Sequence, residues 1–101
     1  MTAQEIEQIV AYRASDYCRQ NGIRSLRLFG SRLHGTASET SDIDLLVEFE
    51  PGLQVGLFGL SRLQIEMSDL FGQQVDLRTV KELSKYFRAQ VSAESKLVYG
   101  E

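Results

Sequence analysis

The segment DIDLLVEF, residues 42–49, constrains the fold more than any other part of the sequence. Its centre holds three consecutive apolar residues, Leu45, Leu46 and Val47. A strand with one solvated face alternates apolar and polar residues, whereas a strand covered on both faces reads as a continuous apolar run. We therefore expect residues 42–49 to form a central strand of a sheet that carries helices on its faces.

The rest of the chain predicts three helices and two further strands around it. Apolar residues recur at helical spacing over residues 3–20, 55–70 and 80–91, and Gly72 is a plausible cap of the second helix. SLRLFG (25–30) and QVDLRT (74–79) have the composition of strands, while the tail KLVYGE is ambiguous. This order favours an α/β (α+β) fold, a small mixed sheet with helices packed on it, and leaves the strand order open.

Size and charge exclude several classes of protein. A chain of 101 residues with 43% hydrophobic content can build one core, so we expect a single domain over residues 1–101. The net charge of −3 argues against general nucleic-acid binding. The single cysteine, Cys18, lies on the apolar face of the first helix, and no stretch approaches the roughly 20 apolar residues of a membrane span. The N-terminus lacks the features of a signal peptide, so we expect a cytoplasmic protein.

The stretch GSRLHGTASETSDID, residues 30–44, joins the first two predicted strands. Gly30 and Ser31 fall where a strand ends and a turn or helix begins. A glycine there lets a phosphate approach the backbone, and the Ser31 hydroxyl adds a donor, although such dipeptides are also common in ordinary turns. Arg32 could neutralise phosphate charge or could simply be solvated. The same stretch contains His34, the only histidine, which we interpret as a turn residue.

Asp42 and Asp44 end this stretch, two residues apart on the predicted strand. Their side chains leave the same face, with Cα atoms about 6 to 7 Å apart, while Ile43 points the other way. Converging carboxylates repel each other, and a hard divalent cation such as magnesium would relieve that repulsion and could hold the phosphates of a nucleotide. The alternative is a solvated strand end.

Together these features resemble the signature of the DNA polymerase beta-like nucleotidyltransferase superfamily, and the resemblance spans nearly the whole chain. It rests on Gly30-Ser31, Arg32 and Gly35, Asp42-Ile43-Asp44, Leu45-Leu46-Val47, Gly72 and Val75-Asp76-Leu77. The resemblance implies the polymerase beta-like fold.

The resemblance also implies the site. It makes Asp42, Asp44 and Asp76 the catalytic residues and the ligands of two magnesium ions. Gly30, Ser31 and Arg32 would bind the co-substrate ATP.

Within the superfamily, the short chain looks most like the minimal nucleotidyltransferases that act as antitoxins of a helical HEPN RNase. That resemblance implies transfer of AMP from ATP to a tyrosine hydroxyl on the HEPN toxin, in a hetero-oligomer with it. The alternative is a binding module that neutralises the partner stoichiometrically. The apolar residues of the C-terminal quarter are candidates for a partner surface, or they pack against the sheet. They are Tyr86, Phe87, Val91, Leu97, Val98 and Tyr99.

Overall fold

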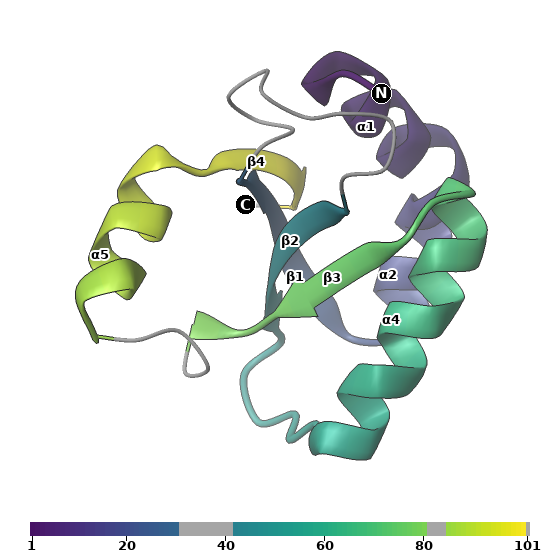
Figure 1. The fold of residues 1–101 in the computed structure, drawn as a ribbon. Coiled ribbons are helices and arrows are strands. Elements are labelled where there is room, and N and C mark those ends of the chain that lie inside the picture. Colours follow the sequence, from purple (N-terminus) through teal and green to yellow (C-terminus); the bar gives the residue numbers. More distant parts are fainter. Residues whose placement is uncertain (31–41, 81–84, 101) are drawn as a thin grey trace.

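The computed structural model describes residues 1–30, 42–80 and 85–100, and these build a four-stranded sheet between two layers of helices (Figure 1). The strands are β1 (Ile23–Phe29), β2 (Ile43–Phe49), β3 (Val75–Arg78) and β4 (Lys96–Gly100). Their order in the sheet is β3-β2-β1-β4. The strand β2 is therefore central, as its continuous apolar run predicts.

The sheet is mixed, which confirms the predicted fold class. The strand β1 pairs antiparallel with β2 and with β4, whereas β2 and β3 run parallel. The ambiguous C-terminal tail forms β4 and closes the edge beside β1. Val98 and Tyr99 pack against the core from this strand, so they contribute to the sheet's own packing rather than forming a free apolar surface.

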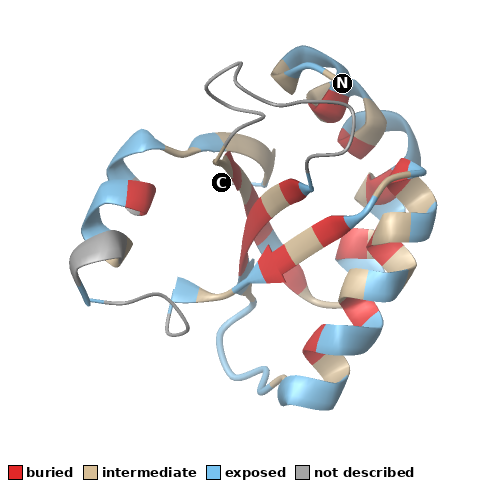
Figure 2. Ribbon diagram, in the orientation of Figure 1, coloured by how far each residue is buried: buried red, intermediate tan, exposed pale blue. Residues whose placement is uncertain are grey.

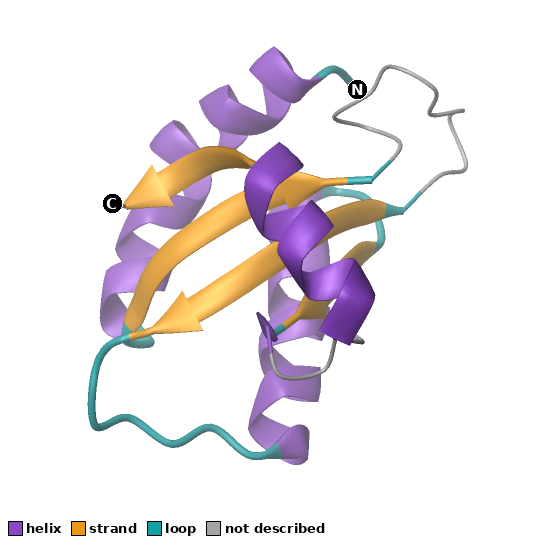
Figure 3. Ribbon diagram, turned by 90° about the vertical axis from the view of Figure 1, so that its left-hand side faces the viewer, coloured by secondary structure: helices purple, strands orange, loops and turns teal. Residues whose placement is uncertain are grey.

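Helices cover the two faces of the sheet unequally. The larger layer holds α1 (Ala3–Ile9), the π-helix η1 (Val10–Ala14), α2 (Ser15–Gln20) and α4 (Leu57–Phe71). The opposite face carries α5 (Lys85–Glu94), which Figure 3 shows in front of the strands while the other helices lie behind them. None of the helices in the described ranges combines the length and apolarity that crossing a membrane requires.

The N-terminal helix confirms its predicted range but is not continuous α-helix. The side chain of Thr2 and that of Glu5 form a reciprocal capping box at its start. A π-helical segment then interrupts it at Val10–Ala14, where the Ser15 hydroxyl donates to the carbonyl of Val10 over 2.9 Å. Apolar periodicity cannot reveal this interruption, because a single wider turn leaves the buried stripe almost intact.

The two later helices differ in how well the sequence locates them. The helix α4 ends at the left-handed Gly72, whose N–H donates to the Ser68 carbonyl, as predicted. The third helix was expected from residue 80, but α5 begins at Lys85. Val80 lies outside that helix, and residues 81–84 fall outside the described part of the chain.

The core fills the space between the sheet and the larger helical layer (Figure 2). Ile43, Leu45 and Val47 point into it from β2, and Cys18 is completely buried there. Burial raises the pKa of the Cys18 thiol to about 11, so this cysteine is a core residue as predicted. On the other face, Leu46 packs with Val91 of α5, so β2 is covered on both faces.

We expect Leu45→Ala to lower the free energy of unfolding by about 2–5 kcal/mol, because the Leu45 side chain is fully buried and its removal leaves a cavity. Denaturant titration measures the change. The matched control is Ile65→Ala, since Ile65 is 64% exposed on α4 and should lose less than about 0.5 kcal/mol. Equal losses in the two variants would contradict the described core.

Candidate functional site

Asp44 and Asp76 lie side by side on neighbouring strands. The parallel pairing of β2 with β3 places Asp44 opposite Asp76 in register, as it places Ile43 opposite Val75. Ile43 and Val75 are fully buried in the core, so the alternation of a strand turns both aspartates to the opposite face, which α5 shares. Asp42 is exposed and immediately precedes β2. The structure therefore brings the three predicted carboxylates together at one end of the paired strands β2 and β3.

The helix α4 holds the strand that carries Asp76. The strand β3 is an edge strand, and its outward N–H groups find acceptors on α4. The N–H of Val75 donates to the Ser68 hydroxyl and that of Leu77 donates to Gln64 Oε1, each over 2.9 Å. Sequence reasoning missed Gln64 and Ser68, although two polar residues four apart on a largely apolar helix were a signal for them.

Gly30 follows β1 at the point where the chain passes the Asp44 carboxylate. Its φ of +77° is a left-handed conformation that favours glycine. A Cβ at this position would collide with Asp44 Oδ2 and would lie 3.2 Å from its Cγ. The Asp44 carboxylate therefore occupies the space that a side chain at residue 30 would fill. This is a local reason for the glycine that the sequence pattern alone does not supply.

The cluster is electrostatically unfavourable when all its carboxylates are charged. Partial burial raises the pKa of Asp44 above 3.8, and repulsion from Asp76 and Asp42 raises it further. A hydrogen bond between the carboxyl groups of Asp44 and Asp76 acts in the same direction. Ionisation of Asp44 in the folded protein therefore costs free energy, which a nearby cation would recover.

The side chain of Arg78 places a positive charge beside this cluster. It lies two residues after Asp76 on β3, and its Nε donates to Asp76 Oδ2 over 3.3 Å. Its charge also opposes the upward shift in the pKa of Asp44. Sequence reasoning assigned no role to Arg78, although a basic residue two positions from an acid on a strand was a visible signal.

The donor chemistry of the cluster suits a hard divalent cation. Carboxylate oxygens are the ligands that magnesium prefers, and Asp44 is only partly buried. Within the described ranges, however, no three His, Cys, Asp or Glu side chains are arranged so that they could hold a metal ion. Binding a metal would therefore require these side chains to reorient, starting with the contact between Asp76 and Arg78.

Two of the predicted nucleotide ligands cannot be placed. Ser31 and Arg32 lie outside the described residues, as do His34 and Gly35 of the same stretch. The structure therefore places Gly30 at the cluster and leaves the roles of Ser31 and Arg32 as predictions.

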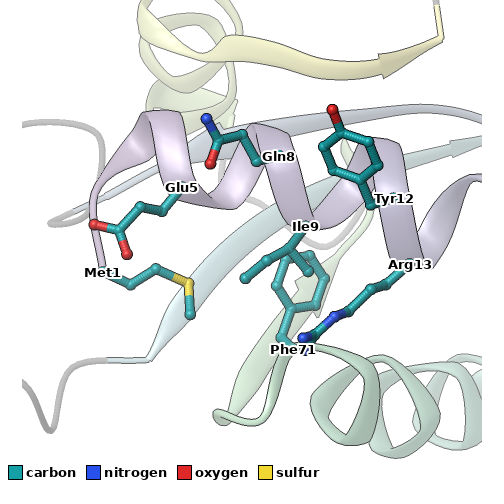
Figure 4. Close-up of a pocket in the computed structure, with 7 residues that line it drawn as sticks. All are labelled: Met1, Glu5, Gln8, Ile9, Tyr12, Arg13 and Phe71. Atoms are coloured by element: carbon teal, nitrogen blue, oxygen red, sulfur yellow. The ribbon is translucent and has the colours of Figure 1, made fainter.

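A groove of about 410 Å³ lies elsewhere, where α1 and η1 meet the end of α4 (Figure 4). Its lining combines apolar and polar side chains: Met1, Glu5, Gln8, Ile9, Tyr12, Arg13 and Phe71. None of the three clustered aspartates lines it. We therefore take the carboxylate cluster, and not this groove, as the candidate active site.

Comparison with known proteins agrees with this geometry. Residues 13–101 match the family model described as "Polymerase beta, Nucleotidyltransferase". The chain belongs to this nucleotidyltransferase family. It is a minimal nucleotidyltransferase with the polymerase beta-like fold, and it is related to protein adenylyltransferases.

This nucleotidyltransferase is similar in sequence to a protein adenylyltransferase and similar in fold to solved toxin–antitoxin complexes. It is 35% identical over 77 residues to the protein adenylyltransferase MntA of Thermococcus cleftensis, which is 76% of each chain. A toxin–antitoxin structure with AMP-PNP has a TM-score of 0.74 at 24% identity, covering 94% of this chain and 73% of the other. A tri-AMPylated HEPN toxin of Shewanella oneidensis with its MNT antitoxin gives 0.68 at 21% identity, with the same coverage. These two structures show the fold.

In the presence of a chelator, we expect Asp44→Asn to raise the melting temperature at neutral pH. Because the pKa of Asp44 is raised in the folded protein, protonation of its carboxyl group favours folding. The stability that Asp44 contributes is therefore fully present below about pH 3.8 and is lost as the pH rises through the folded-state pKa. The gain from Asp44→Asn should therefore vanish as the pH falls below that value. The control is Asp69→Asn on the exposed side of α4, which should change little. A lower melting temperature for Asp44→Asn at neutral pH would contradict the repulsion described here.

The close approach at Gly30 predicts an unequal response to alanine. Gly30→Ala and Gly52→Ala both place a side chain at a positive φ, which costs about 1–2 kcal/mol. A Cβ at Gly52 meets open space, whereas one at Gly30 collides with Asp44. Urea titration should therefore show the larger loss for Gly30→Ala. Equal losses would mean that Gly30 does not pack against the carboxylate.

Proposed function

We propose that this nucleotidyltransferase transfers AMP from ATP to a hydroxyl group on a HEPN-domain RNase toxin, and that it acts as the antitoxin of that toxin. The acceptor that we propose is a tyrosine side chain. The whole reaction takes place at the cluster of Asp42, Asp44 and Asp76, within a complex of the two proteins.

The observation that carries this proposal is the register between β2 and β3. It sets Asp44 directly beside Asp76 on the face opposite the core, with Asp42 one residue before the strand. A purely structural pair of acids would gain nothing from facing each other, because their repulsion raises the pKa of Asp44. A carboxylate with a raised pKa that lies beside two other acids favours a functional site.

The relatives support the choice of substrate and partner. The Thermococcus cleftensis relative is a protein adenylyltransferase, an enzyme class that transfers AMP to proteins. The Shewanella oneidensis structure pairs an MNT antitoxin with a HEPN toxin that carries three AMP groups. We infer the same chemistry and the same class of partner for this chain.

We propose that Asp42, Asp44 and Asp76 hold two magnesium ions together with the triphosphate of ATP. When bound, magnesium would neutralise phosphate charge and orient the reacting groups. The residues of the chain set the other requirements. The chain passes close to Asp44 at Gly30, and we propose that the Ser31 hydroxyl and the Arg32 guanidinium, which follow it in the sequence, contact a phosphate of the nucleotide.

The transfer itself forms one bond and breaks one. The acceptor oxygen attacks the α-phosphorus of ATP in line, and the bond from that phosphorus to the α,β-bridging oxygen breaks, so that pyrophosphate leaves. The hydroxyl proton moves to the Asp76 carboxylate, which β3 and its anchors on α4 hold in place. Asp44 stays beside the reacting phosphate. The products are the AMP ester of the tyrosine and pyrophosphate.

Asp76→Asn tests the catalytic role most directly, because it keeps the size of the side chain and removes its charge. We expect AMP transfer to slow by on the order of 10² to 10⁴-fold while the complex with the toxin still forms. Mass spectrometry of the intact toxin, after incubation with ATP and magnesium, measures the transfer. Asp69→Asn, an exposed acid on α4, serves as the matched control and should retain the full rate.

The same variant separates the enzyme from a stoichiometric binding module. Cells that express the toxin should be protected by the native chain and by Asp69→Asn, and they should not be protected by Asp76→Asn at equal abundance. Full protection by Asp76→Asn, with an unmodified toxin, would show that the chain neutralises its partner by binding alone.

A further inference from the structure

Arg78 occupies a position that the proposed reaction does not explain. The pairing of β2 with β3 places it opposite Leu46, two residue pairs along the strands from Asp44 and Asp76 and on the same face. Its side chain folds back along β3, so that Nε donates to Asp76 Oδ2 over 3.3 Å. The Arg78 side chain is 47% exposed and the Asp76 side chain 29% exposed, so the pair is accessible to a ligand.

An arginine at this point has two opposite effects on a site that binds both a metal and a nucleotide. It stabilises the cluster of like charges, because the guanidinium stays protonated at every relevant pH. It also opposes a metal ion, since a divalent cation must enter beside a fixed positive charge and competes with Arg78 for the Asp76 carboxylate.

We propose that Arg78 is a positioning residue that acts as an exchangeable counter-ion. In the metal-free protein it pairs with Asp76 and holds that carboxylate in place. When metal and ATP bind together, Asp76 turns to the metal, and the freed guanidinium pairs with a phosphate of the nucleotide. The exchange of partners rests on the proposed function, whereas the pairing with Asp76 in the metal-free protein does not.

This exchange couples the two ligands. A metal ion that binds alone leaves the guanidinium without an anion and beside a like charge, so free metal binds weakly. The triphosphate supplies new acceptors for the guanidinium, so metal and nucleotide bind better together than separately. Arg78 therefore favours loading with the metal–nucleotide complex over loading with bare metal. A planar guanidinium suits this role, because it can pair with either a carboxylate or a phosphate.

The first experiment measures Mn²⁺ binding by the full chain, with and without an ATP analogue that carries a non-cleavable α,β-methylene bridge. We expect Arg78→Gln to bind free Mn²⁺ about 3- to 10-fold more tightly than the native chain, because a nearby positive charge is gone. With the analogue present, this advantage should disappear or reverse. Arg78→Lys keeps the charge and should remain close to the native chain in free Mn²⁺ affinity.

Arg24→Gln is the matched control. Arg24 also forms an ion pair with a carboxylate of the sheet, at 3.7 Å from Glu48, and it is similarly exposed. Its removal should leave Mn²⁺ binding unchanged in both conditions. Native or weaker affinity of Arg78→Gln for free Mn²⁺ would overturn the proposal, and so would an equal change in Arg24→Gln.

A second experiment needs neither metal nor nucleotide. In the presence of a chelator, the melting temperatures of the native chain, Asp76→Asn, Arg78→Gln and the double variant form a thermodynamic cycle. We expect Arg78→Gln to lower the melting temperature more in the native chain than in Asp76→Asn, and high salt to reduce the difference. Additive effects would overturn the counter-ion role. If neither the native chain nor any variant binds Mn²⁺ in the presence of the analogue, the proposed function and the exchange of partners by Arg78 are both contradicted. The thermodynamic cycle would still decide whether Arg78 pairs with Asp76 in the metal-free protein.

Discussion

The parallel pairing of β2 with β3 is the constraint on which the site and the core both depend. One register sets Ile43 beside Val75 in the core and Asp44 beside Asp76 on the other face. A shift of one residue would turn the aspartates into the core and the apolar residues out of it. The burial of apolar side chains therefore holds together two carboxylates that would otherwise separate.

The cluster shows how a stable scaffold supports an unfavourable arrangement of charges. Repulsion and partial burial raise the pKa of Asp44, and Gly30 adopts a left-handed conformation beside it. The surrounding structure offsets this through the hydrogen bonds from β3 to Gln64 and Ser68. The repulsion between the carboxylates lies where a bound cation would relieve it, and unfavourable local arrangements of this kind are common at functional sites.

The sequence predicts the elements of this fold better than their arrangement. The unbroken run of Leu45 to Val47 is enough to predict a central strand, because only a strand covered on both faces is apolar throughout. The strand order does not follow from periodicity, so residue spacing could not bring Asp76 to Asp44, and the resemblance to the superfamily had to supply that link. The π-helical turn beside Ser15 also leaves no periodic signal.

The contacts that tune the site were less accessible to sequence reasoning. The spacing of Arg78, Gln64 and Ser68 is visible in the sequence, but their partners become apparent only when β3 is placed between β2 and α4. Gly30 was singled out for its approach to phosphate, and the structure adds its approach to Asp44. The roles of Ser31 and Arg32 stay predictions, since both lie outside the described residues.

The central claim is that Asp44 and Asp76 meet at a metal-dependent nucleotide site. Paramagnetic broadening of backbone amide signals by Mn²⁺, in the presence of an ATP analogue that resists cleavage, locates the metal without any assumption about activity. We expect the broadening to centre on residues 42–45 and 75–77 and to spare Glu50, one residue past the far end of β2. Broadening centred on another acidic surface, or none at concentrations that saturate the nucleotide, would contradict the account.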